Sequence, residues 1–249
     1  METSGRVRVA AAGDVHASEA KREQIERAFS GVRGEADLVL LAGDLTSHGE
    51  PSQAAILAEA CRGLDVPVVA VLGNHDWHAD RVEEVAGVLA EAGVTVLDRS
   101  STVMRIRGTT VGIVGAKGFM GGFGGQLANF GEPLMRQCYA ETTAEVEALE
   151  RGLGEIAHCA LRIAALHYAP IAETLEGEPQ AIWAFLGSER LAFPLAVHRP
   201  DLVLHGHGHA GTFAGSLDSI PVFNVAVPVI GRDFWLFELE PRVDPQVRR

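Results

Sequence analysis

Apolar positions along the N-terminal part of the chain follow two alternating patterns. Short uninterrupted apolar runs are typical of strands buried on both faces, and apolar positions spaced three and four apart are typical of helices packed along one face. Strands are predicted at residues 7–12, 38–42 and 66–71, and helices at 19–30, 51–62 and 81–92. This alternation predicts an α/β layered domain.

The pattern changes from residue 94 onward. Closely spaced strands are predicted first, then a glycine-rich segment at 118–125, a helix at 142–156, and short strands that we expect to pair antiparallel near the C-terminal end. The predicted strands cover residues 94–97, 102–107, 110–114, 161–166, 202–204, 212–217, 222–227 and 234–239. Since no repeat, low-complexity tract or linker interrupts this order, we expect one domain over residues 1–249.

The net charge of −12 argues against broad binding to nucleic-acid backbones, which relies on Lys and Arg. An acidic protein can still bind a phosphate ester if metal ions supply local positive charge. The three cysteines form no CxxC pair, so the sequence favours neither a disulfide framework nor a thiolate zinc site, and Cys61 on a helical pattern is expected to be buried. The N-terminal residues lack the apolar core of a signal peptide and no stretch is apolar enough to span a bilayer, so we expect no membrane partner and a cytoplasmic location.

Five polar clusters share one placement, each directly after a predicted strand. Ligand sites in open α/β sheets form outside the carboxyl ends of strands, so these clusters are expected to converge on one cleft. The glycines within them allow sharp turns and close approach of the backbone. The clusters are Gly13-Asp14-Val15-His16, Gly43-Asp44, Gly73-Asn74-His75-Asp76, His167 and Gly206-His207-Gly208-His209.

The side chains in these clusters suit a pair of metal ions. Carboxylates, an asparagine oxygen and several imidazoles form a mixed nitrogen and oxygen set, which favours Mn, Fe, Zn or Ni over Ca or Mg. A carboxylate can bridge two metals at about 3.5–4 Å, and a hydroxide held between them is a nucleophile at neutral pH. The residues therefore predict a two-metal hydrolytic site.

Taken in order, the five clusters resemble the motifs of the calcineurin-like metallophosphoesterase superfamily, and the His167-Tyr168-Ala169-Pro170 context is similar to small bacterial phosphoesterases. The resemblance extends from Asp14 to His209. It implies a four-layer αββα sandwich with two mixed β-sheets flanked by helices. It also implies two metal ions, most often Mn, Fe or Zn, and hydrolysis of small phosphodiesters or phosphomonoesters by a metal-bridging hydroxide.

The resemblance also implies roles for individual residues. Asp44 would bridge the two metals, His75 would face the phosphate and assist the leaving group, and Asp76 would orient His75 through a hydrogen bond. The other implied ligands are Asp14, His16 and His209 for the first metal and Asn74, His167 and His207 for the second.

One position departs from a well-known branch of the superfamily. Protein Ser/Thr phosphatases carry a phosphate-binding arginine where this chain has His48. The difference disfavours a phosphoprotein phosphatase and makes His48 a candidate substrate contact. Phosphodiesterase and phosphomonoesterase activities stay open, because both use the same metal chemistry.

Two further functions are considered. A nuclease would use the same metals, but the acidic balance and the lack of a basic stripe count against it. A non-catalytic binding scaffold is the alternative from a different class. It is disfavoured because such relatives typically lose the imidazole that His75 retains, and every implied ligand is present.

The remaining segments are open to two interpretations. The glycine-rich segment is either a mobile lid that brings Lys117 to the substrate, or a flexible surface connection or tight barrel-like bend. Trp183 and Phe185 either pack in the core, which we favour, or cover a homo-oligomer contact. We expect residues 174–180 to form a solvated turn, and four isolated histidines to be structural or exposed: His78, His158, His198 and His205.

Overall fold

The computed structural model describes residues 5–129 and 131–242. Its N-terminal half alternates strands and helices, as the apolar pattern predicts. The elements are β1 (Val7–Ala12), α1 (Arg22–Val32), β2 (Leu38–Ala42), α2 (Pro51–Arg62), β3 (Val68–Val71), α3 (Val82–Glu91) and β4 (Val94–Leu97). Short 3₁₀ turns occur between them, and η2 (His75–Trp77) lies directly after β3.

The C-terminal half is richer in strands and in short helices. Its elements are β5 (Ser100–Ile106), β6 (Thr109–Gly115), α4 (Pro133–Glu155), β7 (Leu161–Ala165), α5 (Trp183–Leu186), α6 (Ala192–His198), β8 (Leu202–His205), β9 (Ala214–Leu217), β10 (Ile220–Asn224), α7 (Val227–Ile230) and β11 (Trp235–Leu239).

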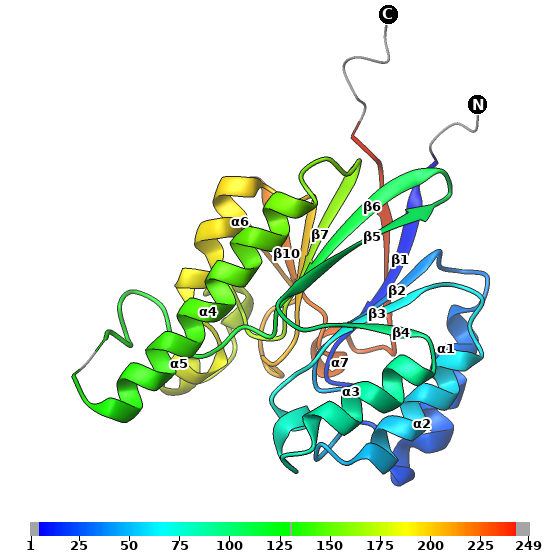
Figure 1. The fold of residues 1–249 in the computed structure, drawn as a ribbon, viewed down its shortest axis with the longest axis horizontal. Helices are drawn as coiled ribbons and strands as arrows, with labels where there is room; N and C mark the ends of the chain where they lie inside the picture. Colours follow the sequence, from blue (N-terminus) through cyan, green and yellow to red (C-terminus); the bar gives the residue numbers. More distant parts are fainter. Residues whose placement is uncertain (1–4, 130, 243–249) are drawn as a thin grey trace, which may run out of the picture.

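The strands form two mixed sheets that pack face to face between layers of helices (Figure 1). The first sheet has the order β11-β1-β2-β3-β4, with β1 to β4 parallel and β11 antiparallel. The second has the order β5-β6-β7-β8-β10-β9, in which β6, β7, β8 and β10 are parallel and the two edge strands antiparallel. The αββα sandwich is confirmed, and the expected antiparallel pairing near the C-terminal end holds for β9 and β11 but not between β10 and β8.

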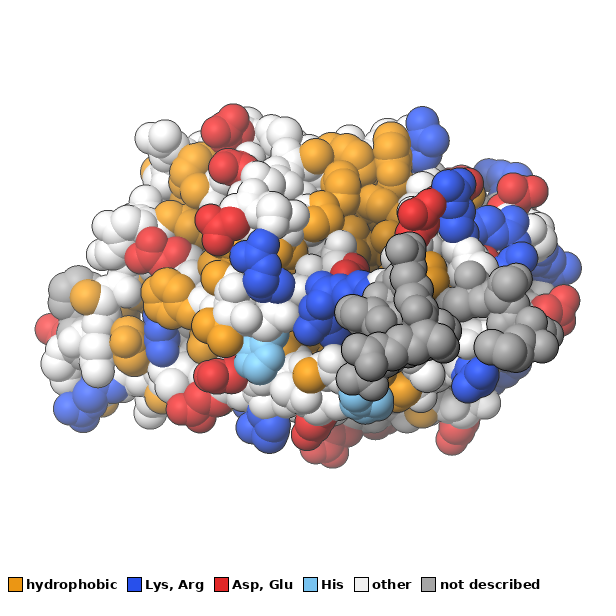
Figure 2. Space-filling view, turned by 90° about the horizontal axis from the view of Figure 1, so that it is seen from above, with side chains coloured by type: hydrophobic (Ala, Val, Ile, Leu, Met, Phe, Trp, Pro, Cys, Tyr) orange, Lys and Arg blue, Asp and Glu red, His pale blue; other side chains and the backbone are white. Residues whose placement is uncertain are grey.

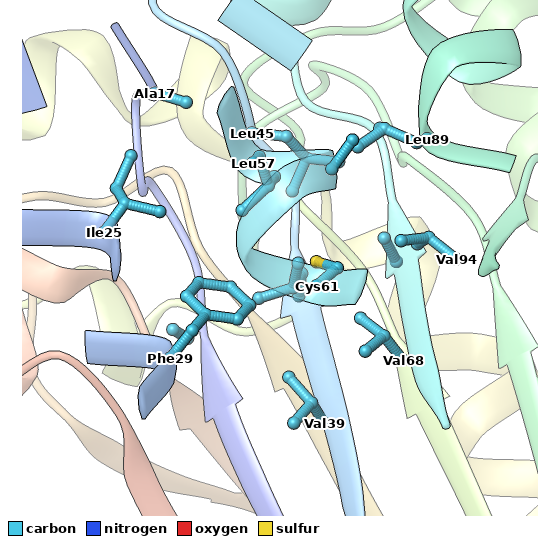
Figure 3. Packing of buried hydrophobic residues seen from close by; sticks show 14 of the residues in the cluster. Ala17, Ile25, Phe29, Val39, Leu45, Leu57, Cys61, Val68, Leu89 and Val94 are labelled. Atoms are coloured by element: carbon cyan, nitrogen blue, oxygen red, sulfur yellow. The ribbon is translucent and has the colours of Figure 1, made fainter. Parts of the chain in front are cut away.

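Strands of the first sheet are buried on both faces, which explains their uninterrupted apolar runs. In β2, Leu38 and Leu40 point into the core between the sheets, whereas Val39 and Leu41 point toward the outer helices. Figure 3 shows the outer layer, in which Phe29 of α1 and Cys61 of α2 pack over Val39. This alternation buries every side chain of the strand and fixes its register.

The helices on the second sheet differ most from the sequence prediction. α4 begins at Pro133, nine residues before the predicted start at 142. The prediction missed its first turns because they are exposed, and Leu134 there is 69% accessible. Without a buried face, those turns show no apolar periodicity. α6 was not predicted, since Pro194 inside it normally marks a helix end.

Both ends of the described chain lie on one face of the molecule, which Figure 2 shows from above. Basic side chains on this face are interspersed with acidic ones, and hydrophobic side chains gather between them (Figure 2). No helix within residues 5–129 and 131–242 is long and apolar enough to cross a membrane.

Candidate metal centre

The loops after β1, β2, β3, β7 and β8 meet at one end of the two sheets. They bring together two groups of possible metal ligands, and within each group the ligand atoms lie within 4.8 Å of one another. Asp44 belongs to both groups. The first group is Asp14, His16, Asp44 and His209, and the second is Asp44, His167 and His207.

Asp44 lies at the centre and is 1% exposed. Its Oδ1 accepts a hydrogen bond of 2.8 Å from the backbone N–H of His75, but its Oδ2 has no hydrogen-bond partner among the described residues. The Nε2 atom of His16 lies 3.8 Å from Oδ2. A buried carboxylate oxygen without a partner is costly, and a bound cation removes that cost.

His167 is fully buried and is held by a backbone carbonyl. Its Nδ1 lies 2.9 Å from Ala42 O, which can only accept, so Nδ1 carries the proton and donates it. In the neutral ring, Nε2 then presents a lone pair to two oxygens, Asn74 Oδ1 at 2.9 Å and Asp44 Oδ1 at 3.3 Å. In that tautomer three electron pairs are directed at one point, and a cation held there removes their mutual repulsion, which makes Asn74 a candidate ligand beside the second group.

The remaining histidines contact Asp14 or a backbone carbonyl. His209 Nε2 lies 2.8 Å from Asp14 Oδ1, and this hydrogen bond raises the pKa of His209. Burial lowers the pKa of His207 to about 3, so its ring is neutral at pH 7. Its Nε2 lies 3.1 Å from Phe185 O and donates to it, which leaves Nδ1 as the atom with a free lone pair.

The backbone is strained at four of these residues. Asp14, His16, Asp44 and His207 all have positive φ angles, between 48° and 70°. Such a conformation costs a non-glycine residue about 1–3 kcal/mol and tends to occur at functional sites. The strain turns the ligand side chains of separate loops toward a common centre.

Two glycines allow the loops to approach this closely. A Cβ atom at Gly43 would lie 2.4 Å from His167 Nδ1, and the φ of +83° there also favours glycine. A Cβ atom at Gly73 would lie 2.2 Å from the backbone nitrogen of Asp44. The sequence predicts close approach of the backbone at these motifs, and this approach is possible because Gly43 and Gly73 have no side chain.

His75 faces the same centre from η2. Its Nδ1 lies 2.8 Å from Ser47 O and donates to it, which leaves Nε2 directed toward the cluster, 3.9 Å from Asp44 Oδ2. The ring also contacts His16 edge-on, with ring centroids 4.6 Å apart. The imidazole is thus held by one hydrogen bond and by ring contacts.

The expected hydrogen bond between Asp76 and His75 is wrong. Asp76 is fully buried and its carboxylate accepts from the backbone N–H groups of Leu45, Thr46 and Gly73 and from the Thr46 hydroxyl, at 2.7–3.1 Å. Burial raises the pKa of this carboxyl, and the hydrogen bonds partly oppose that shift. Asp76 therefore fastens the Asp44 loop to the Asn74 loop, while Ser47 orients His75.

The two candidate substrate contacts lie in different surroundings. His48 is exposed, and both its backbone N–H and its ring face Gln53 in the first turn of α2. Lys117 is half-buried, with its Nζ 4.7 Å from the ring centroid of Phe119 and 5.2 Å from that of Tyr168. Burial lowers the pKa of its amine.

The glycine-rich segment is docked onto residues 184–189 by its backbone. Gly121 N–H donates to Ala184 O at 2.8 Å and Gly122 N–H to Gly187 O at 2.7 Å. The Glu189 carboxylate accepts from the N–H groups of Gly124 and Gly125. These contacts favour an anchored connection over a lid.

One further expectation from sequence is wrong, and another holds only in part. The ring of Phe185 is 57% exposed rather than packed in the core, while Trp183 packs against a small buried cluster. Residues 174–180 form a solvated turn only in part: positions 176, 177, 179 and 180 are exposed, but Thr174 and Leu175 are buried, and the Thr174 hydroxyl lies 2.8 Å from His205 Nε2. His205 is fully buried in β8, as expected for a structural histidine.

Sequence reasoning missed several residues that support the centre. His78 is exposed and its ring contacts that of His75 in a tilted arrangement, with centroids 4.3 Å apart, although an isolated histidine gives no sequence signal for this. Asn224 is buried and bonds to Gly208 O and Ala226 N, which holds the last histidine loop. The ring of Tyr168 packs on that of His207, with centroids 4.4 Å apart. Its position directly after His167 in the sequence could have indicated that it lies at the centre.

Comparisons with known proteins agree with this geometry. A family model described as calcineurin-like phosphoesterase matches residues 7–211. Curated protein sequences gave no significant match.

Three solved structures share the fold. Phosphopantetheinyl hydrolase from Mycobacterium tuberculosis superposes with a TM-score of 0.71 at 16% identity, covering 98% of this chain and 99% of that one. TT1561 of Thermus thermophilus gives 0.55 at 18% identity over 94% and 100% of the chains. GAP50, described as the anchor in the inner membrane complex of Plasmodium, gives 0.59 at 12% identity over 90% and 72%.

Proposed function

The chain belongs to the calcineurin-like phosphoesterase family, and on that premise we propose that it is a two-metal hydrolase of small phosphate esters. The observation that carries the proposal is Asp44, a buried carboxylate shared by both ligand groups with one oxygen unpartnered in the described structure. A structural ion pair would satisfy both oxygens. A shared carboxylate with free coordination capacity suits a bridging ligand between two cations.

The residues divide into two ligand sets around Asp44. Asp14, His16 and His209 would hold one cation, and Asn74, His167 and His207 the other. Their mixed nitrogen and oxygen donors suit Mn, Fe or Zn. When bound, two such cations supply the positive charge that attracts a phosphoryl group and the acidity that makes water a nucleophile near neutral pH.

His75 is the candidate general acid. Since Ser47 O holds its Nδ1, only Nε2 is directed toward the place where a phosphoryl group would sit beside Asp44. A doubly protonated ring at this position donates a proton from Nε2 to the departing oxygen, and the ring stays in place because its other nitrogen keeps its partner.

Hydrolysis of two chromogenic esters tests the proposal. The full chain should turn over p-nitrophenyl phosphate, bis-p-nitrophenyl phosphate or both when loaded with Mn²⁺, and metal analysis should find about two ions per chain. The ratio of the two rates decides between monoesterase and diesterase. Absence of turnover with Mn²⁺, Fe²⁺ or Zn²⁺ across pH 5–9 would overturn the proposal and favour a binding scaffold.

Two further substrates widen the test. One structural relative is named a phosphopantetheinyl hydrolase, so a phosphopantetheinyl ester belongs in the set, although 16% identity supports only a shared fold. A single-stranded oligonucleotide tests the nuclease alternative, and we expect little cleavage because the chain carries a net charge of −12.

A further inference from the structure

A cavity of about 300 Å³ opens beside the candidate metal centre. Its walls come from η2, from the segment after β6, from α4 and from the residue after His167. Three aromatic rings, an amide, an amine and a carboxylate form these walls. The lining residues are Asn74, Trp77, Lys117, Phe119, Glu141 and Tyr168.

The cavity is continuous with the metal centre at two residues. Asn74 lines it and also faces His167 Nε2 at 2.9 Å. Tyr168 forms another wall, and its ring contacts both second-group histidines, with centroids 4.4 Å from His207 and 5.6 Å from His167. A phosphoryl group held at the centre would therefore direct one of its ester substituents toward this cavity.

The walls favour a flat, uncharged occupant. Trp77 lines the cavity and is 45% exposed. The Lys117 amine is directed at the rings of Phe119 and Tyr168 and donates to Gly118 O. These groups within the wall partly satisfy its charge.

The carboxylate in the wall argues against a second anionic group. Glu141 carries negative charge and pairs with Arg99, which lies in the same charged cluster as Lys117 and Glu145. An anion entering the cavity would meet the Glu141 carboxylate as well as the Lys117 amine, whereas an aromatic ring would meet three aromatic faces or edges.

We propose that this cavity binds the organic group of the ester, and that the preferred substrates carry a planar ring there, an aryl or heterocyclic group. Trp77 and Phe119 are the specificity-determining residues. The inference rests on the proposed phosphoesterase function, because the metal centre is what fixes the phosphoryl end. A volume of about 300 Å³ lies at the lower end for ligand pockets and suits one or two fused rings.

Phosphonates test the cavity without the complication of leaving-group reactivity, since their C–P bond is not hydrolysed. Binding of methylphosphonate, benzylphosphonate and 2-naphthylmethylphosphonate to the Mn²⁺-loaded full chain is measured by calorimetry. We expect the naphthyl compound to bind at least about tenfold more tightly than the methyl compound, from the apolar area it buries.

Two variants and one control locate the effect. Trp77→Ala and Phe119→Ala should each reduce the naphthyl advantage to within about threefold, while methylphosphonate affinity stays unchanged and reports an intact centre. The control is Ala90→Trp, which fills a separate groove along α3 that Trp77 also lines. It should leave the naphthyl advantage intact.

The outcomes separate the two proposals. Equal affinity for the three phosphonates, or an advantage that survives both alanine variants or disappears in Ala90→Trp, overturns the cavity assignment even if ester turnover is found. Selective naphthyl binding without turnover of any ester overturns the proposed function and leaves the cavity assignment standing.

Discussion

At the scale of single residues, the candidate metal-binding side chains were the most predictable part of the site. Metals accept only a few side-chain types, so Asp14, Asp44 and His167 could be selected from order and context. Asp76 could not be placed, because a carboxylate beside a histidine in sequence can as readily accept from backbone N–H groups, and here it does so. Which partner it takes depends on loops that are distant in sequence.

Asp44→Asn tests the shared ligand. The amide keeps the hydrogen bond from His75 N–H, but it is neutral and binds cations weakly, so both metal positions should empty together. Elemental analysis should find a fall from about two metals per chain to below about one. Asp65→Asn, an exposed exchange of the same kind, should leave the content unchanged. Retention of both metals in Asp44→Asn would refute the bridging assignment.

His75→Ala tests the division between binding and chemistry. Because the ring is no member of either ligand group, the variant should keep its metals and lose about 10²- to 10⁴-fold in kcat, the usual contribution of a general acid. His78→Ala, which removes the exposed ring in contact with that of His75, should have a much smaller effect. Metal loss in His75→Ala would show that the ring is a ligand.

At the scale of elements, prediction succeeded where a segment is buried and failed where it is exposed. β1, β2 and α2 were predicted to the residue, because both faces of the strands and one face of the helix are covered. β3 begins at Val68 instead of residue 66, since Pro67 precedes it and lacks an N–H. The exposed first turns of α4 carry no apolar signal, so its start could not be found by periodicity.

The docking of the glycine-rich segment gives a prediction at this scale. A Cβ atom at Gly121 would lie 2.4 Å from Ser188 Oγ and 2.8 Å from Ser188 Cβ, and Ser188 is 1% exposed. Gly121→Ala should therefore lower the free energy of unfolding by about 1–3 kcal/mol in urea titrations of the chelated protein.

Gly31→Ala is the matched control, because nothing lies within 4 Å of its added Cβ atom and the residue is helical. It should raise the free energy of unfolding by up to about 1 kcal/mol. If both alanines had the same effect, the glycine-rich segment would not be docked as the contacts indicate.

At the scale of the whole molecule, the site lies where loops of the two sheets meet. Its residues are therefore far apart in sequence, and the order of the motifs predicted the site better than the pattern within any one segment did. Candidate ligands after β1, β2 and β3 come from the first sheet, and those after β7 and β8 from the second. The cavity beside the centre was not predictable in the same way. Trp77, Phe119 and Glu141 come from three elements whose approach only the packed fold defines.

Joining the sheets also buries histidines, and this makes stability depend on pH. Burial lowers the pKa of His205 to about 4, well below its ordinary value of 6.5. Between these two pH values the unfolded chain binds a proton at this residue and the folded chain does not, so acid favours unfolding. The contribution of His205 to stability is complete above pH 6.5 and declines by about 1.4 kcal/mol per pH unit as the pH falls toward 4.

Burial raises the pKa values of Asp76 and Glu145, so these carboxyl groups contribute to the pH dependence with the opposite sign. A difference between variants therefore isolates His205 better than the total pH profile. The slope of unfolding free energy between pH 6 and pH 5, from urea titrations of the chelated protein, should be about 1.4 kcal/mol per unit smaller in His205→Gln than in the parent. His158→Gln, at an exposed position, should keep the parent slope. A His205→Gln slope equal to that of the parent would mean that this buried ring is already protonated in the folded chain. The charged ring would then donate a hydrogen bond from its Nε2 to the Thr174 hydroxyl.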